Sequence, residues 1–432
     1  MKIKFGDISV YLFLLVPLAS FILNGMINET LLIIALLLLA ILAIGPLSLE
    51  EIRNNAVWIL YILAIIFSLL SRPKPISFLY EVMVYILMIL FLVFSRFGWS
   101  TLQKGYRFIL VVGIINAIMI FFQFLMRESF NRTVWQLFTP GWQDYVSKYY
   151  NYQYFSGIQP VPGDAAGVIC FAILILLSVF FVKEMNKRNK NRVLQIIIIV
   201  LLLLMQILTG KKGVLFSEIA AIIVMLLLLF SKPKYWTRLL ISIGILTVAL
   251  FAVWHYVQTH SDSTVFYRIN KFMTQIISGE SYDSGRSLLR DQALLLWRAK
   301  PVLGIGWRRF RELTTIIYGY SNMHDVNFDY LQFLCETGIV GFILIMTTLV
   351  TMLVRTLFVI KNVLRRNEDP DIIKVVVMSA FIQIFTYFYA FLEIPFYDKM
   401  MFFPIYLYSC ICISKYYKEI RGKATDPVAV RA

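Results

Sequence analysis

The sequence contains little charge, little cysteine and very little histidine. Only 15% of its 432 residues are charged, against roughly a quarter in ordinary soluble domains, whereas 59% are apolar or aromatic. This composition excludes a disordered chain and argues strongly against a soluble enzyme. Four cysteines in so long a chain exclude a small disulfide-built domain. Because they lie in or beside apolar runs, we expect buried free thiols.

The charge that is present is unbalanced, with 41 lysines and arginines against 25 aspartates and glutamates and a formal net charge of +16. In a soluble protein this excess would suggest a nucleic-acid partner. In a chain this apolar, it is typical of the cytoplasmic loops that orient a membrane protein. We therefore predict an integral membrane protein that has the lipid bilayer as a partner and does not bind nucleic acid.

Apolar runs long enough to be membrane helices, which need about 20 residues each, recur along the whole chain. They predict an all-α, polytopic fold with about 12 transmembrane helices in a single membrane domain, 1–432. The first run has no small-residue cleavage site and is followed directly by another run, which predicts a retained helix. The predicted runs are 8–24, 30–48, 56–70, 77–95, 108–126, 165–182, 193–208, 214–230, 239–257, 337–354, 372–392 and 401–414.

Short basic connections orient these predicted spans. Lysines and arginines crowd the connections at 183–192 and 355–366 and the segment after the last span. All three fall on one side, which the positive-inside rule assigns to the cytoplasm together with both termini. Two long connections, about 127–164 and 258–336, then lie outside, and we expect short helices in the second. That connection is rich in lysine and arginine, and external cations suit an anionic ligand.

His324 is the histidine with the most suggestive position. It lies in a polar segment near the end of the basic loop, just before the next span. An imidazole there would sit close to the external membrane surface, and histidine is the side chain that titrates near neutrality. From the residues alone, a functional role and an ordinary solvated position are both open.

Basic pairs in two external segments allow two interpretations each. Arg286 and Arg290 share one face of a predicted helix, which favours a helix lying on the bilayer, with a guanidinium grip on pyrophosphate as the alternative. Lys211 and Lys212 lie in a short external hinge. They would either extend to headgroup phosphates or coordinate a bound anion.

Aromatic residues crowd the external segment from Trp135 to Tyr154. Anchoring at the membrane interface is the interpretation that we favour, and stacking on sugars is the alternative.

The sequence contains neither a P-loop nor a His/Cys cluster with zinc-ligand spacing. Direct use of ATP and a zinc centre are therefore not expected.

The stretch from Gly285 to Gly341 resembles the signature of the O-antigen ligase and Wzy-type polysaccharide polymerase superfamily. The pattern is an arginine that opens a helix, Pro-x-x-Gly-x-Gly with an aromatic, a histidine segment, and Glu-x-Gly-x-x-Gly entering a span. The matching residues are Arg286, Pro301, Gly304, Gly306, Phe310, His324, Glu336, Gly338 and Gly341.

The sequence departs from the pattern of that superfamily in three places, one of which covers two residues. Asp325 follows the histidine, where the superfamily usually has asparagine, and Arg290 stands where an aromatic is common. In the hinge, Lys211 and Lys212 replace serine and arginine. Lys212 therefore keeps the positive charge of that arginine but loses its planar fork.

The resemblance implies a glycosyltransferase of the bacterial cytoplasmic membrane whose active site faces outward. It would use a glycan on undecaprenyl pyrophosphate as donor and a sugar hydroxyl as acceptor, with no metal or other cofactor. His324 would be the general base, supported by Asp325 and Glu336, and neighbouring cations would favour its neutral form. Arg286 and Lys212, with Lys211 and Arg290, would hold the pyrophosphate, whose growing charge fixed cations stabilise.

Attack opposite the leaving group implies that the transfer inverts the anomeric configuration. Among the activities of the superfamily, we favour a polymerase of O-antigen, capsule or exopolysaccharide repeat units. Chain-length regulator and flippase proteins would be further partners. A ligase that transfers the glycan to another acceptor, such as lipid A core, is the closest alternative. A flippase or other transporter is the alternative from another class, and it would require charged residues around a central cavity and paired broken helices.

Overall fold

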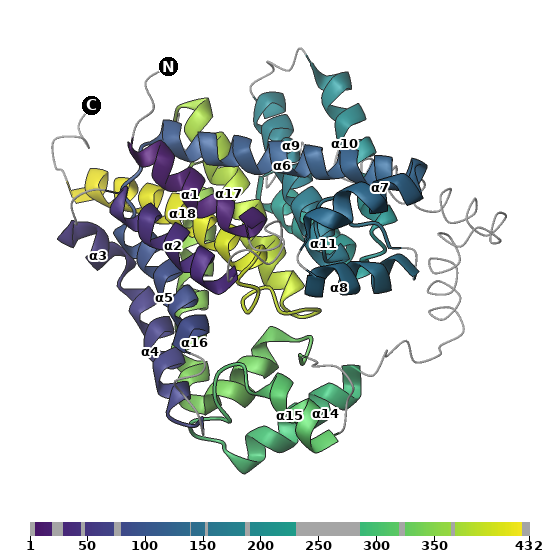
Figure 1. Ribbon diagram of the computed structural model, residues 1–432. Coiled ribbons are helices and arrows are strands. Elements are labelled where there is room, and N and C mark those ends of the chain that lie inside the picture. The colour runs from purple at the N-terminus through teal and green to yellow at the C-terminus, as the bar shows by residue number, and fades with distance from the viewer. Residues whose placement is uncertain are drawn as a thin grey trace.

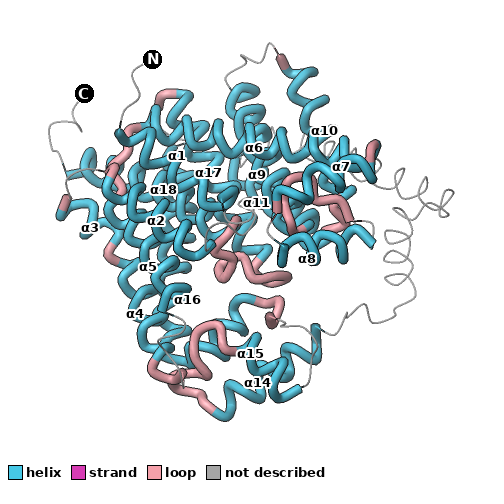
Figure 2. Tube along the Cα trace, viewed as in Figure 1, coloured by secondary structure: helices cyan, strands magenta, loops and turns pink. Residues whose placement is uncertain are grey.

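The computed structural model describes residues 5–19, 29–44, 48–72, 79–138, 140–151, 154–185, 191–229, 286–318, 325–363 and 368–425. These residues form helices joined by turns and contain no strand, which confirms the predicted all-helical class (Figure 1, Figure 2). The helices are α1 (Phe5–Ala19), α2 (Glu29–Leu42), α3 (Leu49–Asn55), α4 (Val57–Leu69), α5 (Leu79–Phe94), α6 (Trp99–Leu125), α7 (Arg127–Val134), the 3-10 helix η2 (Trp135–Leu137), α8 (Pro140–Asn151), α9 (Pro162–Met185), α10 (Arg192–Leu208), α11 (Lys212–Leu229), α14 (Arg286–Ala299), α15 (Phe310–Tyr318), α16 (Asp329–Val363), α17 (Pro370–Tyr389) and α18 (Phe402–Thr425).

Every predicted apolar run falls on a helix except 239–257, which lies outside the described residues. By length and composition, however, only five described helices can each cross a membrane alone: α6, α9, α11, α16 and α17. The pair α3 and α4, bent by 67°, would make a sixth span. The apolar helices α1, α2, α5 and α10 have between 14 and 17 residues, short of the roughly 20 that a span needs. The count of about 12 spans is not confirmed.

The outer surface of the bundle is apolar, as a lipid-facing surface must be. Along α10, Val193, Leu194 and Leu201 are 71%, 56% and 53% exposed. A continuous apolar face of this kind would be a liability in water but suits the hydrocarbon of a bilayer. Together with the long apolar helices, it supports a membrane protein. All four cysteines are free and buried, as expected.

Helix α17 forms the centre of the bundle, and every residue from 375 to 386 is buried. It packs against α9, α11, α16 and α18. Its polar side chains find partners inside the core. Ser379 Oγ lies 2.6 Å from the hydroxyl of Tyr106, and Thr356 donates to Gln383. These bonds matter because an unpaired polar group in a low-dielectric core is costly.

The segments predicted to be cytoplasmic meet at one end of the bundle. Lys418 Nζ lies 2.7 Å from Glu51 Oε1, and Arg355 Nη1 donates to the carbonyl of Asn54 at 2.9 Å. Trp99 Nε1 donates to Glu419 at 3.1 Å. These contacts link connections far apart in sequence, which agrees with the predicted alternation of the connections between two ends.

The signature stretch folds as a small unit, formed by α14, α15 and the start of α16, at the bottom of the view in Figure 1. Its two glycine motifs dock on each other through the backbone. The Ile305 and Gly306 N–H groups donate to the Cys335 and Glu336 carbonyls at 3.0 and 2.8 Å, and Ile339 N–H donates to the Pro301 carbonyl at 2.8 Å. The tight turn that Pro301, Gly304 and Gly306 favour is therefore present, and it pairs with the region of α16 around Gly338.

The signature unit is held on the bundle by the end of α4. The Arg72 guanidinium, buried there, donates to the Trp307 carbonyl and to Glu312 Oε1, the latter at 2.7 Å. The indole of Trp307 stacks on Tyr397 with ring centroids 4.4 Å apart. Tyr397 belongs to the turn between α17 and α18, so these contacts fix the signature unit relative to that turn.

Candidate active site

A cavity of about 670 Å³, with charged side chains in its wall, lies where the signature unit faces the bundle. The turn between α17 and α18 crosses the centre of the view in Figure 2, between α14–α15 and the other helices, and forms one wall of the cavity. With the N-terminus inside, alternate connections are predicted to be external. Residues in or near five of these connections, at 71–76, 127–164, 209–213, 258–336 and 393–400, line this one cavity. They include Glu81, Trp142, Asp164, Lys211, Arg308, Asp325 and Asp398.

The charges in the cavity are of both signs, whereas the sequence led us to expect a cluster of cations. Lys211, Arg308, Arg311 and Lys399 provide positive charge, and Glu81, Asp164, Asp325, Glu393 and Asp398 provide carboxylates. A mixed lining can bind an anionic group through its cations and hydroxyl groups through its carboxylates. It therefore suits a ligand that carries both.

Arg308 is the most connected cation of this lining. Its Nε lies 3.3 Å from Glu81 Oε1, and its Nη1 lies 3.7 Å from Asp325 Oδ1. Burial by itself would lower the pKa of the guanidinium, but the nearby carboxylates Asp325 and Glu81 outweigh burial and raise the pKa above its ordinary value. Arg308 is therefore a permanent positive charge in the wall of the cavity.

The backbone at Arg308 is unusual as well. Its φ angle is 59°, in the left-handed region that is costly for a residue with a side chain. The Glu336 carboxylate secures this geometry by accepting hydrogen bonds from the N–H groups of Arg308 at 2.6 Å and Phe310 at 3.2 Å. Glu336, predicted as a supporting residue, is fully buried and acts on the loop that carries Arg308.

Asp325 lies in the cavity beside two arginines. Its carboxylate is 3.7 Å from Arg308 and 3.6 Å from Arg311 Nε, and it accepts a hydrogen bond from Gln332 at 3.2 Å. His324 lies outside the described residues, so its side chain is not placed. Because Asp325 is the next residue along the chain, the backbone reaches the cavity immediately after position 324.

The opposite wall comes from the starts of α9, α11 and α18. Asp164 is in the first turn of α9, and Lys211 directly precedes α11. Asp398 accepts hydrogen bonds from the N–H groups of Met400, Met401 and Phe402 at 2.8, 3.3 and 3.1 Å. Burial raises the pKa of the Asp398 carboxyl above its ordinary value, although these bonds oppose the shift. The carboxyl thus binds a proton more readily than a solvated aspartate.

The two predicted arginines of α14 contact different protein groups. Arg286 Nη2 lies 2.7 Å from Glu393 Oε1, and its Nη1 donates to the Leu392 carbonyl at 3.1 Å. Arg290 lies over the ring of Phe328, with Cζ 5.3 Å from the ring centroid. Glu393 lines the cavity, so the pair that it forms with Arg286 lies at the cavity wall.

The two predicted lysines are neighbours with different positions. Lys211 lines the cavity, and a Cβ atom built on Gly163 would lie 3.7 Å from its Cε. Lys212 is half-buried at the first position of α11. Lys212 is not among the residues that line the cavity.

Several cavity residues were missed by the sequence analysis. Glu81 and Asp398 each stand at the edge of an apolar run. A charged side chain costs little free energy there, so its presence does not indicate a functional role. Arg308 and Arg311 were two of many basic residues in one loop. The available signal was the predicted alternation of connections, which places all of these residues on one side but does not show that they meet.

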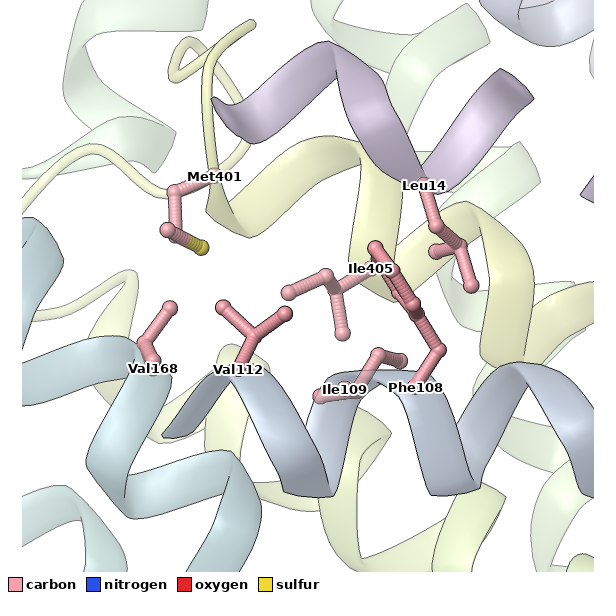
Figure 3. Close-up of a pocket in the computed structure, with 7 residues that line it drawn as sticks. All are labelled: Leu14, Phe108, Ile109, Val112, Val168, Met401 and Ile405. Atoms are coloured by element: carbon pink, nitrogen blue, oxygen red, sulfur yellow. The ribbon is translucent and has the colours of Figure 1, made fainter. Parts of the chain in front are cut away.

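Within the described residues, no group of three or more histidine, cysteine, aspartate or glutamate side chains could hold a metal ion. A second pocket, of about 20 Å³, is lined by apolar side chains (Figure 3), namely Leu14, Phe108, Ile109, Val112, Val168, Met401 and Ile405. It has room for about one water-sized probe. Its lining offers packing and no chemistry.

Residues 197–346 match the family model described as O-antigen ligase. No curated protein matches the chain. The matched region includes α11, α14, α15 and the docked glycine motifs, and it contains Arg308 and Asp325 of the cavity. The chain therefore carries, over residues 197–346, the domain of the O-antigen ligase and Wzy-type polymerase superfamily, and the resemblance found in the sequence is confirmed.

Proposed function

We propose that this protein polymerises lipid-linked polysaccharide repeat units at the external face of the bacterial cytoplasmic membrane. It transfers a glycan from undecaprenyl pyrophosphate to a sugar hydroxyl, with inversion and without a metal or nucleotide. The observation that carries the proposal is the cavity where the signature unit meets the connections predicted to be external, with charges of both signs in its wall. Its cations suit the pyrophosphate and its carboxylates suit sugar hydroxyls.

In this proposal His324 removes the proton from the acceptor hydroxyl as that oxygen attacks the anomeric carbon. The bond from that carbon to the pyrophosphate oxygen breaks, and lipid pyrophosphate leaves with the electron pair. Lys211, Lys212 and Arg286 stabilise the charge that develops on the leaving group. Asp325, held between Arg308 and Arg311, fixes the position of the segment that carries His324.

A transporter would also have a charged cavity, but its charges would occupy a different position. Transporter sites lie near the middle of the bilayer, between broken helices. Here the charges lie in turns or in the first turn of a helix, as Glu81 does in α5 and Asp164 in α9. A cavity at helix ends favours chemistry at the membrane surface over passage through the bundle.

The proposal is tested by turnover. The purified protein, incubated with lipid-linked repeat units and a chelator but without ATP, is expected to produce longer lipid-linked chains, seen as a ladder on a gel. A second reaction contains lipid A core as well. A product on lipid A core with no ladder would show the ligase alternative, which the name of the matched family also suggests. If neither product forms, the proposal that this protein transfers a glycan is contradicted.

Filling the cavity without disturbing the fold is expected to stop the reaction. Gly141 lines the cavity, and a Cβ atom built on it meets no atom within 4 Å. Gly141→Trp is therefore expected to lower the polymerisation rate about 10- to 100-fold, because a displaced substrate loses its reactive geometry. The matched control is Gly98→Trp, at a glycine that is also open but outside the cavity lining. Equal activity of the two variants would argue against this cavity as the active site.

A further inference from the structure

Helix α8 brings one of the two tryptophans of the external aromatic segment to the cavity. Trp142 is half-buried and lines the cavity, and it also packs against Phe138 and Val146. Trp135, seven residues earlier in the same segment, packs on the same small cluster but is not among the cavity-lining residues. A pure membrane anchor would turn its ring toward the lipid, which does not explain a tryptophan in the wall of a cavity that charged side chains also line.

Polar groups that could hold a sugar line the same cavity. Asp164 and Lys211 both line the cavity, and Lys211 interacts electrostatically with the Asp164 carboxylate. Lys211 also lies directly over the start of α9, given its closeness to Gly163. An aromatic face beside a carboxylate and an ammonium group offers an apolar platform together with acceptors and donors for hydroxyl groups.

We propose that Trp142 and Asp164 form a binding subsite for the first sugar ring of the donor, the one attached to the lipid pyrophosphate. The inference rests on the proposed function, in which Lys211 contacts the pyrophosphate. A ring bonded to that pyrophosphate must lie next to Lys211, inside the cavity that Asp164 and Trp142 also line. The indole stacks on the apolar face of the ring, and the carboxylate accepts hydrogen bonds from its hydroxyl groups.

Binding of two lipids to the protein in nanodiscs tests this subsite without any turnover. One lipid carries the glycan on undecaprenyl pyrophosphate, and the other is undecaprenyl pyrophosphate without sugar. Trp142→Ala is expected to weaken binding of the glycan lipid about tenfold and to leave binding of the sugar-free lipid unchanged. Asp164→Asn removes a charge that interacts with Lys211 and so changes the affinity for both lipids, but it is expected to weaken binding of the glycan lipid about tenfold relative to the sugar-free lipid. Trp142→Phe, which keeps an aromatic face, is expected to restore most of the affinity for the glycan lipid.

Trp135→Ala is the matched control, because it removes a tryptophan from the same aromatic cluster outside the cavity lining. It is expected to bind both lipids as the unchanged protein does. If the two tryptophan variants behave alike, or if Trp142→Ala weakens both lipids equally, Trp142 is an anchor and the subsite is wrong. If the unchanged protein binds the sugar-free lipid but gains nothing from the glycan, only the subsite fails. Failure to bind either lipid would overturn the proposed function together with it.

Discussion

Replacing His324 with alanine is expected to abolish chain extension, with a rate about 10² to 10⁴ times lower than that of the unchanged protein. Without the imidazole, the acceptor hydroxyl must attack while it still holds its proton. The cations around the leaving group remain, so the loss should fall on the catalytic rate and leave donor binding intact. The measurement is the initial rate of ladder formation at saturating lipid-linked substrate.

The other two histidines provide the control for that experiment. His255→Ala and His260→Ala remove the same side chain from segments that carry no signature residue, and both variants should extend chains at an ordinary rate. Binding of sugar-free lipid pyrophosphate and the unfolding temperature of His324→Ala show whether the variant is folded. A folded His324→Ala protein that extends chains within about threefold of the normal rate would remove histidine from the mechanism, since a working general base is worth far more than that.

The helices themselves could be predicted because their signal is local. An apolar run of about 20 residues specifies a buried or lipid-facing helix regardless of what packs on it. The turn at 300–306 could be predicted for the same reason, from one proline and two glycines. The number of membrane spans could not be predicted, because apolar composition does not distinguish a short helix packed within the bundle from one that crosses the bilayer.

The cavity could be predicted only in part, because its residues come from distant connections. The positive-inside rule placed Lys211, Asp325 and Asp164 on one side, but their meeting depends on how α9, α11 and α16 pack. The ion-pair partner of a charged residue cannot be predicted from the sequence either. Arg286 was predicted to bind pyrophosphate, and the structure shows it paired with Glu393 at 2.7 Å. In the proposed mechanism, a multiply charged pyrophosphate competes with that carboxylate for the guanidinium.

Replacing Gly338 with alanine is expected to have the largest effect on the fold of any single change considered. The residue has a φ angle of 64°, and a Cβ atom there would lie 2.3 Å from the Val302 carbonyl oxygen and 2.5 Å from the Gly304 nitrogen. Those atoms belong to the backbone and cannot swing aside. The left-handed conformation costs a side-chain-bearing residue about 1–2 kcal/mol, and overpacking adds about 1–3 kcal/mol, so we expect a loss of roughly 2–5 kcal/mol.

The loss should appear as a lower unfolding temperature in detergent and as loss of chain extension, because the docked turn holds the loop of Arg308. Gly304→Ala is expected to behave in the same way, since a Cβ atom there would lie 2.4 Å from the Gly338 nitrogen. The two changes break one contact, so the double variant should be destabilised by less than the sum of the single effects. Gly422→Ala, at a helical glycine where an added Cβ atom would meet no atom within 4 Å, should be neutral or slightly stabilising. A Gly338→Ala protein that unfolds at the normal temperature would show that the two glycine motifs do not dock on each other as described.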